Sequence, residues 1–102
     1  MRSDNMLRGT LFAIDRELEN LETLNSSELK KGIVVLKDAH WTDRLVLPIA
    51  GAVEGQQLEI INNATWDSKI AKENTNLSSD FVLTGKSGCA YFRFLKNKWW
   101  KM

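Results

Sequence analysis

The sequence predicts a mainly β fold, in which a short N-terminal coiled-coil helix precedes a small antiparallel β-sandwich. Three observations lead to this prediction: an apolar stripe with heptad spacing near the N-terminus, a change of hydrophobic period to 2 after Ser27, and turn residues that recur from there on. We therefore expect two parts, a helical stem over residues 1–31 and a β-sandwich domain over residues 32–102.

The expected helix is defined by five apolar residues spaced 4, 3, 4 and 3 positions apart. This spacing places them on one narrow stripe, which favours a parallel coiled coil. The same residues could instead line an amphipathic helix that packs on its own domain. Asn25 and the two serines after it predict the end of the helix. The residues assigned to the oligomer interface are Leu7, Leu11, Ile14, Leu18 and Leu21.

Six short segments rich in Val, Ile, Leu and aromatic residues follow, each bounded by turn residues, and they are typical of a small antiparallel sandwich. Their ranges are 33–38, 43–51, 57–61, 80–85, 89–95 and 98–102. Pro48, the only proline, has no backbone N–H and therefore marks an edge or a bend. We expect the polar segment 66–79 to form one more edge strand followed by a loop.

The β part is too small to bury a large fraction of its surface by itself. The single cysteine, Cys89, excludes an internal disulfide and any metal site built from several thiolates of one chain. Oligomerisation is the remaining common way to stabilise so small a domain. Both parts of the chain therefore favour a homo-oligomer, although Leu and Ile at the a and d positions do not decide its stoichiometry.

The composition of the chain excludes some classes of binding partner. A net charge of +1 lacks the excess of Lys and Arg that nucleic-acid binding requires. No apolar run approaches the roughly 18 residues of a membrane span, so membrane insertion is not expected. Residues 1–24 carry charges throughout, and we therefore expect no secretory signal peptide.

Catalysis has little support in the residues present. His40 lies near Asp38 and Asp43, which could form a weak metal site or a proton-transfer pair, but such a cluster is more often an ordinary polar loop. Cys89 is expected to be a buried, small apolar residue. No pair of carboxylates and no phosphate-binding loop has the spacing of a known site. We therefore predict no enzymatic activity, no catalytic residues, no cofactor and no metal.

The tryptophans are better candidates for binding, because an indole combines a large apolar face with a polar N–H. Adjacent residues of a strand point to opposite faces, so only one of Trp99 and Trp100 can pack inward beneath the phenylalanines of segment 89–95. A turn at residues 96–98 would make the C-terminus a hairpin. The expected ligand-binding residues are His40, Trp41, Trp66 and Trp100.

Two stretches, LVLPIAGAVEGQQLEIINNATW (45–66) and FVLTGKSGCAYFRFLKNKWWKM (81–102), resemble the C-terminal pattern of bacteriophage tail fibres and related phage-like particles. The matching positions are Leu47, Pro48, Ala50, Gly55, Leu58, Ile60 and Asn62 in the first stretch and Leu83, Gly85, Ser87, Phe92 and Trp99 in the second.

This resemblance implies a homotrimer with a stem and a β-rich tip, located in a virion or an extracellular phage-like particle. It implies a non-enzymatic receptor-binding or adhesion function, in which the tip recognises a bacterial surface glycan or an outer-membrane protein. The alternative that it allows is a structural trimerisation module, which registers the fibre chains and has no ligand of its own.

Overall fold

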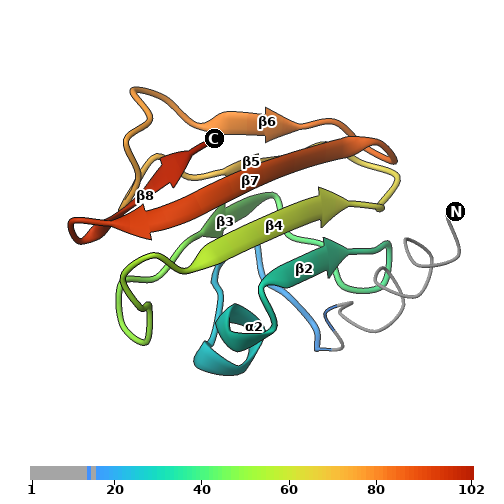
Figure 1. The fold of residues 1–102 in the computed structure, drawn as a ribbon. Coiled ribbons are helices and arrows are strands. Elements are labelled where there is room, and N and C mark those ends of the chain that lie inside the picture. Colours follow the sequence, from blue (N-terminus) through green and yellow to red (C-terminus); the bar gives the residue numbers. More distant parts are fainter. Residues whose placement is uncertain (1–13, 15) are drawn as a thin grey trace, which may run out of the picture.

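The computed structural model describes Ile14 and residues 16–102 of the chain, and Figure 1 shows its architecture. Two four-stranded sheets pack as a small sandwich, and one short helix lies beside them. The elements are β1 (Leu21–Thr23), α2 (Ser26–Lys31), β2 (Ile33–Leu36), β3 (Arg44–Val46), β4 (Gln57–Asn62), β5 (Ser68–Ile70), β6 (Phe81–Leu83), β7 (Gly88–Leu95) and β8 (Lys98–Lys101).

Both sheets are mixed, whereas the sequence led us to expect antiparallel pairing throughout. One sheet has the order β1-β3-β5-β6 and the other the order β2-β4-β7-β8. The pairs β1–β3, β3–β5 and β2–β4 are parallel, while β5–β6, β4–β7 and β7–β8 are antiparallel. The first five strands alternate between the two sheets. Two of these strands that pair within one sheet are therefore joined by a crossover through the other sheet, and such a connection lets them run parallel.

The inner faces of the two sheets enclose one core, which forms because alternate residues of each strand point inward. In β4, for example, Leu58, Ile60 and Asn62 are buried, whereas the residues between them are partly exposed. The core also includes Leu24, which lies just before α2, and Leu29, which belongs to α2. Residues on both sides of position 31 therefore contribute to the same core.

The C-terminal hairpin is confirmed. β7 and β8 are joined by Lys96 and Asn97, whose φ angles of 52° and 66° fit a two-residue turn of the type that matches strand twist. Trp99 is fully buried, and its ring centroid lies 5.0 Å from that of Phe94. Trp100 points to the outer face of the sheet and is 38% exposed.

The helix stop expected at Asn25 is wrong, because α2 begins there. The Asn25 side chain accepts a hydrogen bond from the backbone N–H of Glu28, and the Glu28 carboxylate accepts one from the backbone N–H of Asn25. This reciprocal capping satisfies two N–H groups at the helix start. Gly32, at φ 75°, ends the helix in the left-handed conformation that glycine adopts without strain.

The helical stripe is also wrong where the structure describes it. Residues 16–25 form no helix, and Leu21 belongs to β1, where it is 55% exposed. Ile14 is 2% exposed and donates its backbone N–H to the carbonyl of Val35, and Leu18 packs against the same core. Both pack against the core of their own chain. Leu7 and Leu11 lie outside the described residues, and self-association as a trimer stays a prediction.

Three smaller expectations can be compared with the structure, and two of them, the edge position of the strand after residue 66 and the burial of Cys89, are wrong. Pro48 follows the end of β3, as a residue at a bend should. The strand expected after residue 66 exists as β5, but it lies between β3 and β6 rather than at a sheet edge. Cys89 is exposed, because it points outward from β7. Within the described residues, no helix has the length and apolar character needed to cross a membrane.

Candidate binding site at the loop end

Three loops meet at the right-hand end of the sandwich in Figure 1: residues 37–43, 63–67 and 84–87. We call this region the loop end. The Asp38 carboxylate accepts hydrogen bonds from the backbone N–H and the hydroxyl of Thr65, which joins the first two loops. Lys86 donates its backbone N–H to the carbonyl of Ala64 at 2.7 Å, which joins the second and third. The three loops therefore form one connected surface.

Two tryptophans predicted to bind a ligand lie together at the loop end. The ring centroids of Trp41 and Trp66 are 5.5 Å apart, and their planes are tilted by 60°. Trp41 is half-buried, whereas Trp66 is 52% exposed. Such tilted pairs are favourable for aromatic rings, and the exposed member presents an apolar face to solvent. His40 precedes Trp41 in the same loop and is also half-buried.

The backbone that carries Trp66 is held by hydrogen bonds on both sides. The fully buried Asn62 donates its amide to the carbonyls of Trp66 and Leu83, at 2.9 Å each. Its side-chain oxygen accepts the backbone N–H of Ala64 at 3.1 Å. The Asp67 carboxylate accepts the N–H of Gly85 at 2.8 Å. Trp66 is therefore an exposed ring on a fixed backbone.

Close backbone packing explains why position 85 is a glycine. A Cβ atom at this position would lie 2.4 Å from the carbonyl oxygen of Thr65, closer than real Cβ contacts come. Only glycine lets the loop 84–87 approach the loop 63–67 this closely.

Trp41 is positioned by the residue that follows it. Thr42 is fully buried, and its hydroxyl lies within hydrogen-bond distance of the backbone carbonyls of Glu19 and Asn20. Its own carbonyl accepts the hydroxyl of Ser68, itself fully buried, at 2.8 Å. These bonds connect the loop 37–43 to β5 and to the segment that precedes β1.

The Asp38 and Asp67 carboxylates both accept hydrogen bonds from the protein itself. Backbone donation from Thr65, followed by that from its hydroxyl, lowers the pKa of Asp38 below its usual value, so this carboxylate stays charged. Two buried nitrogens, in contrast, have no hydrogen-bond partner: His40 Nδ1 and Trp41 Nε1. An indole N–H can only donate, so Trp41 lacks an acceptor.

Trp100 does not belong to this site. It pairs with Arg93, five residues along β7 from the loop end, or roughly 17 Å at the rise of a strand. Its indole N–H donates to the carbonyl of Leu95 at 2.9 Å, and Lys98 Nζ lies 6.0 Å from the ring centroid. The structure therefore joins three of the four expected ligand-binding residues and separates the fourth.

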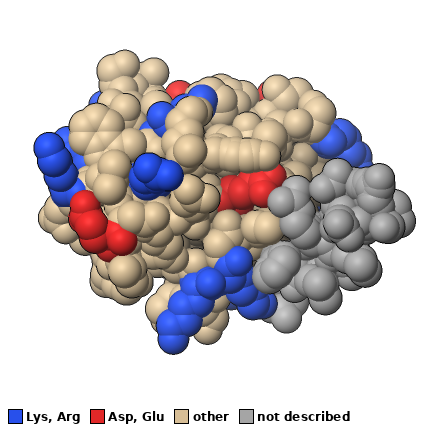
Figure 2. Space-filling model, in the orientation of Figure 1, with Lys and Arg blue, Asp and Glu red and all other residues tan. Residues whose placement is uncertain are grey.

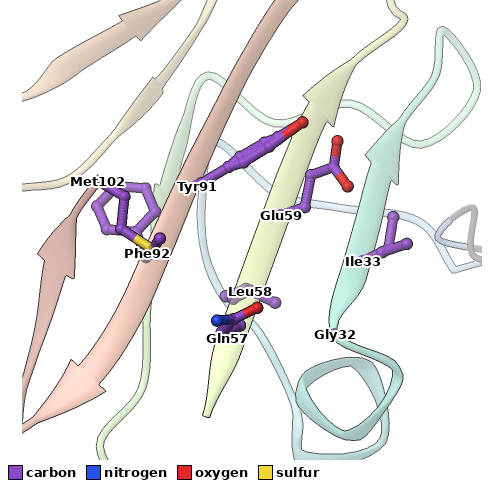
Figure 3. Close-up of a pocket in the computed structure, with 8 residues that line it drawn as sticks. All are labelled: Gly32, Ile33, Gln57, Leu58, Glu59, Tyr91, Phe92 and Met102. Atoms are coloured by element: carbon purple, nitrogen blue, oxygen red, sulfur yellow. The ribbon is translucent and has the colours of Figure 1, made fainter. Parts of the chain in front are cut away.

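A second surface lies on the outer face of the sheet β2-β4-β7-β8. Figure 2 shows this face with uncharged residues over most of its middle, an acidic patch among them and basic residues mainly at the rim. A hollow of about 330 Å³ lies there. Figure 3 shows the Tyr91 ring reaching from β7 over β4, the strand that carries Glu59. Glu59 and Tyr91 line the hollow together with Gln57, Gly32 and four apolar residues.

The carboxylates that lie near His40 in sequence are not grouped around it as metal ligands in the described part of the chain. The Asp38 carboxylate is bound to Thr65. In the part of the chain that the structure describes, no three His, Cys, Asp or Glu side chains are grouped so that they could hold a metal ion.

Sequence reasoning missed the residues that support the site. The strand expected over residues 57–61 stops one residue short of Asn62, yet Asn62 occupies an inward position in this alternating apolar strand. A polar residue at a core position is the signal that could have identified it, because buried amides need several partners.

The family model described as "Metalloprotease StcE, beta-sandwich domain" matches residues 20–102. A solved structure of enterohemorrhagic E. coli StcE(132-251) has a TM-score of 0.55 and 13% identity, with 86% of this chain and 95% of that chain covered. A chain in a structure of a chaperone-substrate complex has a TM-score of 0.61 and 21% identity, with 79% of this chain covered. This chain spans only 16% of that one. No curated protein matches.

These findings overturn the tail-fibre resemblance, and with it the receptor-binding function, the trimerisation alternative and the location in a virion. The pattern misled because its positions encode general features of a β-sandwich. Leu58, Ile60 and Asn62 are the inward residues of one strand, and Trp99 is a core residue. Because the match extends over residues 20–102, the chain belongs to the family of StcE metalloprotease β-sandwich domains.

Proposed function

We propose that the chain is a non-catalytic accessory domain of an StcE-like metalloprotease, and that it binds a partner through the loop end. The family description supports the first part. The donor set supports it as well, because a zinc protease commonly takes two histidines from one helix and the whole chain has one histidine. The residues present therefore do not fit a catalytic zinc, and no catalytic step is assigned to them.

The observation that carries the binding role is Trp66. Its ring is 52% exposed, whereas its backbone carbonyl accepts a hydrogen bond from Asn62. The side chains of the two neighbouring residues, Thr65 and Asp67, are also held by hydrogen bonds. A large exposed aromatic ring on a rigid backbone is the kind of group that dominates interfaces, because little conformational entropy is lost when it is covered.

The non-catalytic role is tested by incubating the purified chain with unfolded casein, with and without added Zn²⁺. We expect no cleavage in either case. Hydrolysis that a chelator abolishes would contradict the accessory role.

The binding role is tested by selecting ligands from a random-peptide display library on the wild-type chain. Each selected peptide is then measured against Trp66→Ala and against Trp100→Ala, which removes an exposed tryptophan far from the loop end. We expect binding to fall about tenfold or more with the first variant and to change little with the second, as for an interface anchor. Equal effects of both variants, or no enrichment, would remove the loop end as the contact surface.

A further inference from the structure

Arg93 differs from the two other arginines that the structure describes, because it has no carboxylate partner. Arg16 and Arg44 each bind two carboxylates, at 2.9 Å or less. The Nε atom of Arg93 is buried and has no hydrogen-bond partner, whereas its two terminal nitrogens are not buried. A guanidinium is always charged and has five N–H donors, so Arg93 presents a cation that lacks an acceptor.

The neighbours of Arg93 on the outer face of the sheet β2-β4-β7-β8 are mostly apolar or aromatic. Gln57 and Trp100 are its partners across the two adjacent strands. Tyr91 lies two residues away on β7 and therefore points to the same face, and Met102 donates its backbone N–H to the Tyr91 carbonyl. Tyr91 is 41% exposed, Trp100 38% and Met102 63%. The cation therefore lies within an exposed apolar patch.

The composition of this patch is that of a protein interface. Tyr, Trp, Met and Arg are the residue types enriched at interface cores. The exposed thioether of Met102 offers no N–H or hydroxyl with which a sugar could form a hydrogen bond, whereas an apolar side chain of a polypeptide can cover it. The patch therefore suits a polypeptide better than a glycan.

The charges around the patch indicate how a partner lies on it. Lys98, whose Nζ lies 6.0 Å from the centroid of the Trp100 ring, adds a second cation near Arg93. Glu59 lies opposite Tyr91 and lines the hollow of about 330 Å³. A carboxylate is therefore favoured at Arg93, and an uncharged apolar group is favoured in the hollow.

The spacing of these two positions fits an extended chain. Arg93 and Tyr91 are two residues apart on β7, which corresponds to about 7 Å at the rise of a strand. In an extended peptide, two side chains that point to the same side are also two residues apart, with the same separation.

We propose that the outer face around Arg93 is a second interaction surface, which binds an extended polypeptide segment with an acidic residue two positions from an apolar one. The carboxylate accepts hydrogen bonds from the terminal nitrogens of Arg93, and the apolar side chain covers the hollow beside Tyr91. The surface is separate from the loop end and goes beyond the binding role proposed above.

The test titrates ¹⁵N-labelled chain with a capped glycine-serine peptide that contains leucine and, two positions later, aspartate. A control peptide has asparagine in place of the aspartate. We expect the backbone signals of residues 91–93 and 98–101 to shift, and the asparagine peptide to bind about tenfold more weakly. Arg93→Gln should remove this difference, whereas Lys69→Gln, which removes one positive charge from the other sheet, should keep it.

No shift at millimolar aspartate peptide, or equal affinity for the two peptides, would overturn the proposal. Both readings are made on the wild-type chain and do not depend on any variant folding. Equal shifts with glucuronate at the same concentration would reject a polypeptide partner. Shifts confined to the loop end, residues 37–43, 63–67 and 84–87, would also overturn this surface but not the loop-end role, so the two proposals fail separately.

Discussion

Trp99 donates its indole N–H to the carbonyl of Pro48 at 2.9 Å, across 51 positions of sequence, from a side chain that is fully buried. The bond joins the last strand to the segment after β3, and so ties one sheet to the other. Asn74 and Asn76 fix the same residue from the side, because Trp99 donates its backbone N–H to the first and accepts one from the second.

Trp99→Phe should therefore destabilise the domain by about 2–4 kcal/mol, because it leaves a cavity and an unpaired carbonyl. Trp100→Phe, one residue along and on the exposed face, should cost about 0.5 kcal/mol or less. Urea unfolding followed by circular dichroism measures both. Similar losses for the two variants would show that the buried hydrogen bond and packing contribute little.

Asn62 should be as important to the fold as an apolar core residue. Asn62→Ala leaves two carbonyls and one N–H without their partner in a buried position, and we expect a loss of about 2–4 kcal/mol. Asn63→Ala is the matched control, since that side chain is exposed, and it should change stability by about 0.5 kcal/mol or less. If the two variants unfold at the same urea concentration, the amide network does not stabilise the loop end.

Asp80 should make stability depend on pH in the acid range. Its carboxylate accepts Arg44 Nε at 2.7 Å and the backbone N–H of Lys72 at 3.0 Å, and these bonds lower its pKa from 3.8 to about 2. A lowered pKa in the folded state stabilises the fold above the unfolded value, and this stabilisation is lost as pH falls from about 4 to about 2.

The measurement compares wild type with Asp80→Asn at several pH values. We expect the variant to be less stable at neutral pH, and the difference to shrink between about pH 4 and pH 2. Asp43→Asn, an exposed carboxylate just before β3, is the control. A difference that stays constant over this range would contradict the ion pair.

Asn97 should respond to substitution according to its backbone conformation. Its φ of 66° at the second turn position favours glycine, so Asn97→Gly should stabilise the hairpin by about 0.5 kcal/mol. Asn97→Ala should destabilise it by about 1 kcal/mol, because alanine tolerates positive φ less well than asparagine. Thermal unfolding ranks the three proteins, and a higher melting temperature for the alanine variant would refute the turn assignment.

Much of the β part could be predicted because each strand has its own local signal. The terminal hairpin is the clearest case: alternating residues in β7, a polar turn and an adjacent tryptophan pair decide which side chain faces inward. Sheet membership could not be predicted, because short strands give no information about which distant partner they pair with.

The N-terminal prediction failed for a different reason. Leu18 and Leu21 fit heptad spacing, but over so few residues the pattern also fits an irregular segment that leads into a strand. Asn25 is equally suited to end one helix or to cap the next, and only the Glu28 partner distinguishes the two.

At the candidate site, the tryptophans were predicted and their surroundings were not. Trp41 and Trp66 are 25 positions apart in sequence, and no spacing rule brings them together. Their proximity depends on Asp38 binding Thr65 and on the close approach at Gly85, both of which are tertiary contacts.

The parallel pairing of β1 with β3 and of β2 with β4 has a kinetic consequence. Each pair joins residues more than 20 positions apart, so the chain must close long loops before these contacts form. Only β7 and β8 meet across a two-residue turn. Refolding should therefore take milliseconds to seconds rather than microseconds, with the terminal hairpin available early and the remaining strands assembling around it.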